Sequence, residues 1–477
     1  MSTPAERQRR ILYVDLDNTL LATDVLWESI VLLAKQQPLA FLLLPFWMLK
    51  GKVFFKQQIA NRVQPDMTTL PVNQPVLDFI HEEKKAGRRV ILATASMQTL
   101  ATKAAAHFDV FDGVIATTDG ENMGGRAKLA AMKRMSGEQP FDYIGDRSVD
   151  IPIWKECAET LAVNPTASLR KKAGGFTKEF HGEKRSPKVI LKALRVYQWV
   201  KNLLLFIPMI LAHKVGDTEA QIHCVLAFFV FSLSASSVYV LNDVLDVESD
   251  RAHPRKSKRP FASGALPLQY AVYLIPLLLL VAFSVSTTLL PPKFTLALVL
   301  YLAMTTAYSV YLKQLPIVDV LMLAGLYSFR ILAGAQAAEV PVSAWMLAFS
   351  LFIFLSLAFI KRYTELLVMR ERNQISAKGR GYVVSDIDII RTLGPISGYM
   401  AVLVLALYIN STDVAALYSH PFRLWFVVPL MLYWITRVWF VAHRGEMHDD
   451  PIVFALKDKI SYILCAIAAV IVYVATN

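Results

Sequence analysis

The stretch LNDVLDVESDRAHPRKSKRP, residues 241–260, decides the fold expected for most of this chain. It closes an apolar run long enough to cross a bilayer, and it reads NDxxDxxxD. On a helix of about 3.6 residues per turn, Asn242, Asp243, Asp246 and Asp250 fall within an arc of roughly 100°. Carboxylates so placed repel one another unless a cation lies among them. A basic cluster follows at once, and carboxylates for Mg²⁺ beside cations for phosphate are what a Mg-diphosphate requires.

The composition points to a membrane protein. Of the 477 residues 55% are hydrophobic, and the mean hydropathy of +0.41 is too high for an ordinary soluble protein. The net charge of +12 does not indicate nucleic acid, because the basic residues concentrate in short loops between apolar runs. Cys157, Cys224 and Cys465 form no CxxC pair, so we expect neither a disulfide framework nor a zinc site. We expect no cleavable signal peptide at the polar N-terminus.

Before this membrane part, the sequence predicts a parallel α/β sheet. Ile11 to Val14 form a buried-strand pattern that ends in the DxDxT sequence of residues 15–19. Residues 89–93 and 141–144 are two more strand patterns, and they end in Thr94 and in GDRSVD, residues 145–150. Because parallel sheets place their chemistry at strand carboxyl ends, these polar residues are expected to meet.

In this order the four parts, with Lys128 as the third, resemble the haloacid dehalogenase (HAD) superfamily of phosphatases over about residues 10–170, and we expect the domain to comprise residues 1–170. The resemblance implies a Rossmann-type sheet with a helical cap at about residues 22–75. It implies that Asp15 is the nucleophile and Asp17 the general acid/base, and that Thr94 and Lys128 hold the phosphoryl oxygens. Mg²⁺ is expected to bind four carboxylates, those of Asp15, Asp17, Asp146 and Asp150. A degenerate domain kept for docking or regulation is the alternative.

The expected cap contains the apolar run Pro38 to Lys50, which is too short to span a membrane and is broken by Pro45. One interpretation is the buried core of the cap. The other is a segment resting on the bilayer, with Phe46 and Trp47 in the headgroup layer. A basic linker is expected at residues 171–190, where it would also contact the membrane surface.

From Trp199 onward we predict an all-α bundle of nine membrane spans. The approximate spans are 199–213, 221–242, 267–290, 294–312, 316–337, 342–362, 392–410, 423–442 and 459–476. Loops on the side of the N-terminal domain hold about 16 Lys and Arg, and the opposite loops hold three. The positive-inside rule therefore predicts a multi-pass protein of the bacterial inner membrane with a cytoplasmic N-terminal domain.

NDxxDxxxD after the second span resembles the UbiA superfamily of intramembrane prenyltransferases, over about residues 191–477. Aromatic prenyltransferases of that superfamily carry a second aspartate-rich motif after the sixth span. Here that span ends in KRYTE, residues 361–365, with one carboxylate and several cations. This departure, together with QWVKN at 198–202, YSVYLK at 308–313 and HDDP at 448–451, resembles the branch that makes polyprenyl-phosphate phosphoribose.

That branch implies phosphoribosyl diphosphate as donor and a polyprenyl monophosphate as acceptor, with one Mg²⁺ at each of the two sites of the chain. By resemblance Asp243, Asp246 and Asp250 hold Mg²⁺ on the donor. The other expected contacts fall into two groups. Lys256, Arg259 and Lys313 would neutralise the leaving diphosphate, and Lys361, Arg362 and Lys201 would steer the lipid phosphate. Asn202, Asn242, Tyr308 and Glu365 complete the expected substrate-binding set.

Together the two domains suggest a bifunctional enzyme whose HAD domain removes the 5′-phosphate of the lipid product. An aromatic prenyltransferase with a tethered phosphatase, and a lipid-binding membrane protein with a regulatory HAD domain, are the alternatives. Arg330 lies inside the fifth span, so we expect it to face the bundle interior and to pair with a carboxylate or a phosphate. We expect Gly334, Gly394 and Gly398 to be helix-packing positions, and His448-Asp-Asp-Pro451 to be either a metal site or a polar turn.

Overall fold

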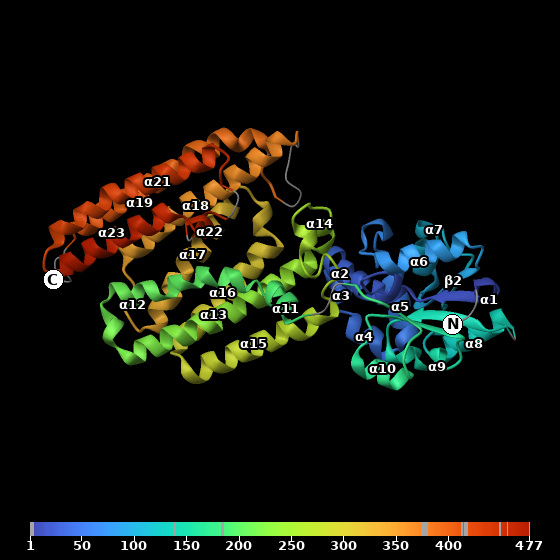
Figure 1. Cartoon of the computed structure of the whole chain (residues 1–477). Coiled ribbons are helices and arrows are strands. Elements are labelled where there is room, and N and C mark those ends of the chain that lie inside the picture. The colour runs from blue at the N-terminus through green and yellow to red at the C-terminus, as the bar shows by residue number, and fades with distance from the viewer. Residues whose placement is uncertain are drawn as a thin grey trace. The chain divides into compact units, whose positions relative to one another are not determined.

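The computed structural model describes residues 4–476 except 138, 183–185, 374–379, 412–413, 415–417, 448–449 and 456. The chain divides into two compact units (Figure 1). The first comprises residues 1–195 with 239–276, and the second comprises residues 196–238 with 277–477. The first unit therefore includes the aspartate motif and the helix ends that flank it.

A six-stranded parallel sheet forms the centre of the first unit, as the strand patterns predicted. Its order is β3-β2-β1-β4-β5-β6. The strands are β1 (Ile11–Val14), β2 (Val90–Met97), β3 (Gly113–Thr117), β4 (Phe141–Gly145), β5 (Glu159–Val163) and β6 (Lys178–Phe180). Tyr13 of the central strand β1 pairs in register with Ile91 of β2 and Tyr143 of β4. The carboxyl ends of β1, β2 and β4 consequently lie together at one edge.

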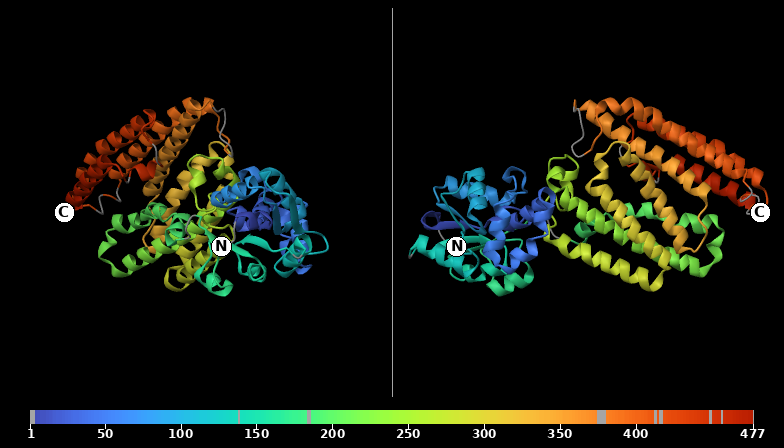
Figure 2. Two further views of the ribbon diagram at one scale, coloured as in Figure 1. Left: turned by 45° about the vertical axis from the view of Figure 1, so that its right-hand side comes forward. Right: turned by 180° about the vertical axis from the view of Figure 1, so that it is seen from behind.

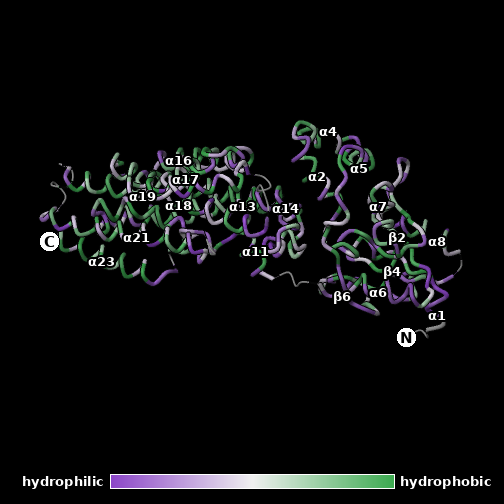
Figure 3. Tube along the Cα trace, turned by 90° about the horizontal axis from the view of Figure 1, so that it is seen from above, coloured by the Kyte–Doolittle hydropathy of each residue, from purple (hydrophilic) through white to green (hydrophobic). Residues whose placement is uncertain are grey.

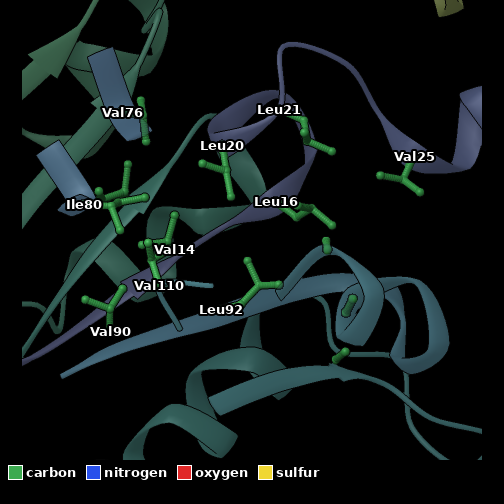
Figure 4. Close-up of a cluster of buried hydrophobic side chains, with 14 of the residues drawn as sticks. Val14, Leu16, Leu20, Leu21, Val25, Val76, Ile80, Val90, Leu92 and Val110 are labelled. Carbon is green, nitrogen blue, oxygen red and sulfur yellow. The ribbon is translucent and has the colours of Figure 1, made fainter. Parts of the chain in front are cut away.

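Helices cover both faces of the sheet. Leu12 and Val14 of β1 point to one face, where they pack with α6 (Gln74–Lys85) and α7 (Gln98–Phe108). Figure 4 shows part of this cluster, including Val76 and Ile80 of α6. Ile11 and Tyr13 point to the other face, against the helices α8 (Arg126–Ser136), α9 (Ile151–Trp154) and α10 (Ala167–Ala173). The alternation of side chains along β1 explains why this strand is buried on both sides.

The expected cap is a set of four helices inserted between β1 and α6. They are α2 (Val25–Gln36), α3 (Pro38–Phe41), α4 (Leu44–Leu49) and α5 (Lys52–Ala60). Asp24 caps the N-terminus of α2 through a hydrogen bond from the Leu26 N–H, and Pro38 begins α3. Their own small core contains Leu33, Trp47 and Ile59.

The region predicted as a linker, residues 171–190, contains the end of α10, all of β6 and the start of α11 (Pro187–Ala193). β6 pairs with β5 through Leu161↔Lys178 and Val163↔Phe180, so this region extends the sheet. Lys184 and Arg185, which contributed to its basic character, lie outside the described residues.

Eight described helices are long and apolar enough to cross a membrane, and they match eight of the nine predicted spans. They are α13 (Thr218–Leu245), α15 (Gln269–Leu289), α16 (Pro292–Val310), α17 (Val318–Ala337), α18 (Ala344–Glu371), α19 (Ile387–Ile409), α21 (Val427–His443) and α23 (Lys459–Thr476). α18, α19, α21 and α23 run alongside one another in the second unit (Figures 1 and 2). Figure 3 shows that these helices are mainly hydrophobic along their length.

The predicted first span, 199–213, is not one continuous helix, and most of its residues belong to a bent helix pair. Residues Val196–Phe206 form a 3₁₀ segment, η4, and Ile207–Leu211 form the short helix α12. The bent pair consists of α11 and the stretch Val196–Leu211, which meet at an angle of 51°. The described part of the chain therefore has eight spans, or nine if α11 and this stretch together count as one span. Arg195 lies in the break with a φ of 50°, a left-handed conformation that no helix can continue through.

Glycines allow close helix packing in the second unit, as predicted. A Cβ added to Gly334 would lie 2.1 Å from the Leu205 carbonyl oxygen, and one added to Gly394 would lie 2.0 Å from the Trp439 ring. At Gly398 the nearest atom would be Cγ2 of Ile435 at 2.6 Å. All three are therefore packing positions.

Candidate functional sites

The DxDxT segment places two carboxylates at the carboxyl edge of the sheet. β1 ends at Val14, and the Asp15 N–H donates to the Ile144 carbonyl oxygen of β4 at 3.0 Å. The chain then turns through Asn18, whose φ is 55°. Asp15 and Asp17 are buried, with 7% and 6% of their surfaces exposed. A strand end followed at once by a tight turn thus directs both carboxylates to one site.

Asp15, Asp146 and Asp150 form a cluster in which one carboxylate oxygen of each lies within 4.8 Å of the others. Three hard oxygen donors at this spacing fit Mg²⁺. The loop after β4 needs Gly145, because a Cβ there would lie 2.7 Å from Oδ2 of Asp150. The structure therefore brings together three of the four residues predicted to bind the metal, with the nucleophile candidate Asp15 among them, while Asp17 lies outside this group.

Lys128 supplies the cation of this site. Its Nζ lies 3.1 Å from Oδ1 of Asp15 and 3.8 Å from Oδ1 of Asp150. Burial lowers the pKa of Lys128, but Asp15 and Asp150 outweigh it, and the net pKa is raised. Nζ also donates to the Tyr143 hydroxyl at 2.9 Å, and that hydroxyl donates to Asp150 at 3.0 Å. Tyr143 was not identified from the sequence, because an aromatic residue in a strand pattern indicates core.

Asp17 lies apart from the cluster and has a different electrostatic environment. Its Oδ1 accepts the Val25 N–H at 2.8 Å, and its Oδ2 accepts the Ser96 hydroxyl at 2.7 Å and the Thr94 hydroxyl at 3.4 Å. Burial, with the nearby carboxylates of Asp24 and Asp15, raises the pKa of Asp17 to about 7. A carboxyl group that holds a proton near neutral pH suits a general acid.

Arg147 joins the cap to this site and was also missed by sequence reasoning. Its Nη2 lies 3.1 Å from Oδ2 of Asp24 and its Nε lies 3.3 Å from Oδ1 of Asp146. The side chain is 44% exposed, so it can reach a substrate as well as these carboxylates. Arg147 follows directly after Asp146 in GDRSVD, and that adjacency is the signal that could have pointed to it.

The aspartate motif lies in the same unit, where α13 ends and the short helix α14 (Val247–Arg251) begins. Asp243 and Asp250 are each 2% exposed. Nη1 of Arg259 lies 3.1 Å from Asp243 Oδ1 and 2.6 Å from Asp250 Oδ2, and Arg195 forms an ion pair with Asp243. Arginines therefore neutralise the two buried carboxylates.

Asp246 lies at the junction of the two helices, at the N-terminal boundary of α14, and is half-buried, as is Asn242 one turn earlier. Among the described residues, three carboxylates within 4.8 Å occur only in the phosphatase-like site, so Asp243, Asp246 and Asp250 form no equally tight group. Their donor types fit Mg²⁺, with Arg259 between two of them. Lys256 is exposed in the loop that follows.

In the second unit a buried charge network surrounds Arg362 of α18. The guanidinium forms ion pairs with Asp319 of α17 and with Glu365, and both Arg362 and Asp319 are at most 1% exposed. The Tyr308 hydroxyl of α16 donates to Asp319 at 2.8 Å. Arg380 approaches Asp319 at 3.6 Å. Three predicted substrate-binding residues, Tyr308, Arg362 and Glu365, thus share one network. Lys313 lies just beyond α16, in the turn Leu312–Gln314, and is half-buried.

A second cluster in this unit is centred on Asp450. Its Oδ2 accepts Nζ of Lys201 at 3.1 Å and Nζ of Lys361 at 3.3 Å. The structure therefore joins two predicted lipid-phosphate residues, 160 positions apart, through a carboxylate that the sequence placed in either a metal site or a polar turn. His448 and Asp449, from the same HDDP sequence, lie outside the described residues.

Arg330 faces the bundle interior, as expected, and is 5% exposed. Its guanidinium donates to Oδ1 of Asn202 at 3.0 Å and to the Tyr301 hydroxyl at 2.9 Å. These described hydrogen bonds go to neutral acceptors, and the expected carboxylate or phosphate partner of Arg330 stays a prediction. Asp319, which lies eleven residues before Arg330 in the sequence, pairs with Arg362. Asn202 is buried and also donates to Ser232 at 2.9 Å, so in this structure it takes part in helix contacts.

Residues 203–473, more than half of the chain, match the model of the UbiA prenyltransferase family. This chain belongs to the UbiA prenyltransferase family. Residues 50–155 match the haloacid dehalogenase-like hydrolase family. The chain is therefore a multi-pass UbiA-family protein with an N-terminal HAD-like domain, and both family matches indicate enzymes.

Three relatives show how far the similarity of this UbiA-family chain extends. An uncharacterized protein of Sinorhizobium fredii, y4nM, is 33% identical over 96% of this chain and 89% of its own length, so both domains are matched. The nodulation protein NoeC of Azorhizobium caulinodans is 36% identical over 57% of this chain and 88% of its own length. The decaprenyl-phosphate phosphoribosyltransferase of Mycobacterium tuberculosis is 33% identical over 58% of this chain and 90% of its own length.

Proposed function

We propose that this protein transfers a 5-phosphoribosyl group from phosphoribosyl diphosphate to a polyprenyl phosphate, and that its HAD domain removes the 5′-phosphate from the product. The observation that carries the proposal is the charge of the KRYTE sequence, residues 361–365, in the C-terminal half of α18. A prenyl-diphosphate donor needs a second acidic group at this position. This chain has Lys361 and Arg362 there, and Glu365 is the one carboxylate in KRYTE. Similarity to relatives named decaprenyl-phosphate phosphoribosyltransferase supports the same choice.

The aspartate motif is assigned to the donor. We propose that Asp243, Asp246 and Asp250 would hold Mg²⁺, which when bound would neutralise the diphosphate of the donor, and that Asn242 contacts the donor. Arg259 already lies between two of these carboxylates, and we infer that it turns to the departing diphosphate together with Lys256 and Lys313. A guanidinium can form two parallel hydrogen bonds with a phosphate, which suits it to this exchange.

The acceptor phosphate is assigned to cations of the second unit. Lys201 and Lys361 share Asp450 as a counter-ion, so an anionic phosphate can replace that carboxylate without creating a new charge imbalance. A phosphate oxygen of the lipid forms the new bond to C1 of the ribose while the bond from C1 to the diphosphate oxygen breaks. The electron pair leaves with the diphosphate. Because the acceptor is already an anion, the step needs no strong general base.

The HAD domain is assigned the second reaction. We propose that Asp15 attacks the phosphorus of the 5′-phosphate and that Asp17 gives its proton to the departing ribose oxygen. Lys128 and Thr94 hold the phosphoryl oxygens, and Mg²⁺ at Asp15, Asp146 and Asp150 would neutralise their charge. Water, deprotonated by Asp17, then hydrolyses the aspartyl-phosphate and releases inorganic phosphate. The proposal places this domain in the cytoplasm and the spans in the bacterial inner membrane, as the loop charges predict.

The test is the full-length protein in lipid bilayers with polyprenyl phosphate and phosphoribosyl diphosphate labelled in the ribose. Labelled lipid should form, free of the 5′-phosphate in the wild type and carrying it in Asp15→Asn. If no labelled lipid forms, the transferase assignment is wrong. If the two proteins give the same phosphorylated product, the phosphatase assignment is wrong.

The competing function is transfer of a prenyl group to an aromatic acceptor, and the same preparation distinguishes it. Given labelled prenyl diphosphate and 4-hydroxybenzoate, the protein should form no prenylated product. Asp246→Asn should abolish the phosphoribosyl transfer. If Asp246→Asn instead leaves transfer unchanged, the aspartate motif has no part in the reaction.

A further inference from the structure

The cap of the HAD-like domain carries a run of apolar residues that its own core does not cover. Residues 38–49 read PLAFLLLPFWML and contain no charged or polar side chain apart from the Trp47 indole N–H. Five large apolar side chains of this run are more than 60% exposed. They are Leu39 (81%), Leu42 (66%), Phe46 (64%), Met48 (62%) and Leu49 (86%). We call these five the cap apolar face.

Trp47 fixes the direction in which this face points. Its side chain is 7% exposed and packs with Leu33, Phe55 and Ile59 in the small core of the cap. The Arg62 guanidinium lies over the indole ring, 4.5 Å from its centroid. Because Trp47 anchors α4 from inside, its neighbours Phe46 and Met48 must point outward. The buried-core interpretation of this run thus holds for Trp47, and the exposed residues require another partner.

We infer that the cap apolar face inserts into the surface of a lipid bilayer. Two prolines lie in the first turns of short helices, Pro38 in α3 of 4 residues and Pro45 in α4 of 6 residues, so the run cannot span the membrane. Exposed lysines flank it on both sides: Lys35 before it, and Lys50 and Lys52 after it. Apolar side chains between basic residues are the composition of segments that rest in the headgroup layer and bind acidic lipids.

The bilayer is favoured over another protein by what the same unit contains. The first unit includes the end of the spanning helix α13, residues 239–245, and the beginning of α15, residues 269–276. This unit is therefore tethered to the membrane by two helix ends whatever else it binds. A tether keeps the local concentration of lipid high, so even a small apolar face can remain inserted. An apolar face of this size left in water would promote aggregation.

A site-directed probe in the full-length protein tests this. Cys157 and Cys465 are replaced by alanine, and Cys224 is left because it is fully buried. A fluorophore is then attached to cysteine introduced by Phe46→Cys, and the protein is placed in bilayers containing phosphatidylglycerol and lipids with a nitroxide near the headgroup. The matched control is Met135→Cys in α8, an apolar residue that is also exposed but lies outside the cap.

Insertion predicts quenching at position 46 that is several-fold stronger than at position 135. Equal quenching at the two positions overturns the inference. Self-quenching at position 46 that grows with protein density, without quenching by the nitroxide lipid, would show that a second copy covers the face and would also overturn it. Thermal unfolding of each labelled protein checks that the fold is intact. The test uses no substrate, so its result is independent of the proposed reactions.

Discussion

At the scale of single residues, Arg259 controls the charge of the aspartate motif. It bridges Asp243 and Asp250, both 2% exposed, and we assign it to the leaving diphosphate. Arg259→Ala should lower phosphoribosyl transfer roughly 10- to 100-fold, because hydrogen bonds to charged groups contribute about 1.5–3 kcal/mol. Labelled-lipid formation at several Mg²⁺ concentrations measures the loss.

Lys258→Ala is the matched control for Arg259→Ala. Lys258 lies next to Arg259 in the same basic cluster, but its side chain is exposed, and its backbone carbonyl is what accepts Nζ of Lys192 at 2.8 Å. It should keep near wild-type activity. Equal losses in the two variants would mean that the motif responds to total positive charge and that the bridging position is irrelevant.

The buried pair of Asp319 and Arg362 gives a second residue-scale prediction, concerning stability. Both side chains are at most 1% exposed, so Asp319→Asn removes the buried counter-ion of the arginine and leaves it only Glu365, whose side chain is 39% exposed. We expect a loss of about 3–5 kcal/mol, seen as a lower thermal midpoint in detergent. Adding Arg362→Met should restore part of the loss, because the double variant buries no unpaired charge. If the double variant is less stable than Asp319→Asn, the pair is not the cause.

These residues also show what could be predicted from the sequence. The carboxylates of the HAD-like site were identified because each follows a strand, and a parallel sheet gathers strand ends. The pairing of Asp319 with Arg362 was not predicted, because the two residues lie 43 positions apart on different helices and Arg330 is nearer to Asp319 in the sequence. The contacts of Asp450 with Lys201 and Lys361 were also not predicted, because these residues lie far apart in the sequence. Which charges pair across a bundle depends on helix packing, which local sequence does not specify.

At the scale of helices, Gly394 is predicted to control packing between α19 and α21. A Cβ there would lie 2.0 Å from the Trp439 ring. Gly394→Ala should therefore destabilise the protein by about 1–3 kcal/mol, the usual cost of overpacking. Gly325→Ala in α17 is the control, because a Cβ there meets no atom within 4 Å. Thermal unfolding of both variants in detergent provides the comparison, and similar midpoints would contradict the packing role.

The helices themselves were predictable to different degrees. Eight spans followed from runs of apolar residues, a signal that needs no tertiary information. The break before η4 could not be predicted in this way, because it depends on the left-handed conformation of Arg195, whose side chain pairs with Asp243. Similarly, β6 was assigned to a linker since Lys178–Phe180 is too short to give a strand pattern on its own. Short or bent elements are defined by the partners that hold them.

At the scale of the whole molecule, one compact unit contains both the HAD-like domain and the aspartate motif. A buried ion pair links them: the Arg251 guanidinium of α14 donates to Glu28 of α2 at 2.6 and 3.1 Å, and their side chains are 6% and 3% exposed. The Thr23 hydroxyl also donates to Glu28 at 2.6 Å. Arg251 is the residue after Asp250, so the cap contributes to positioning the aspartate motif.

Glu28→Gln should therefore reduce phosphoribosyl transfer although Glu28 lies in the HAD-like domain. Losing one partner of a buried pair costs about 3–5 kcal/mol and should loosen α14, so we expect at least about a tenfold loss. Hydrolysis of a small soluble phosphate ester should change little, because Glu28 contacts none of the three clustered carboxylates. Lys35→Ala is the control: it removes the half-exposed pair with Glu248, 3.6 Å apart, which contributes about 0–1 kcal/mol. If Glu28→Gln and Lys35→Ala transfer phosphoribose at the same rate, the cap does not support the aspartate motif.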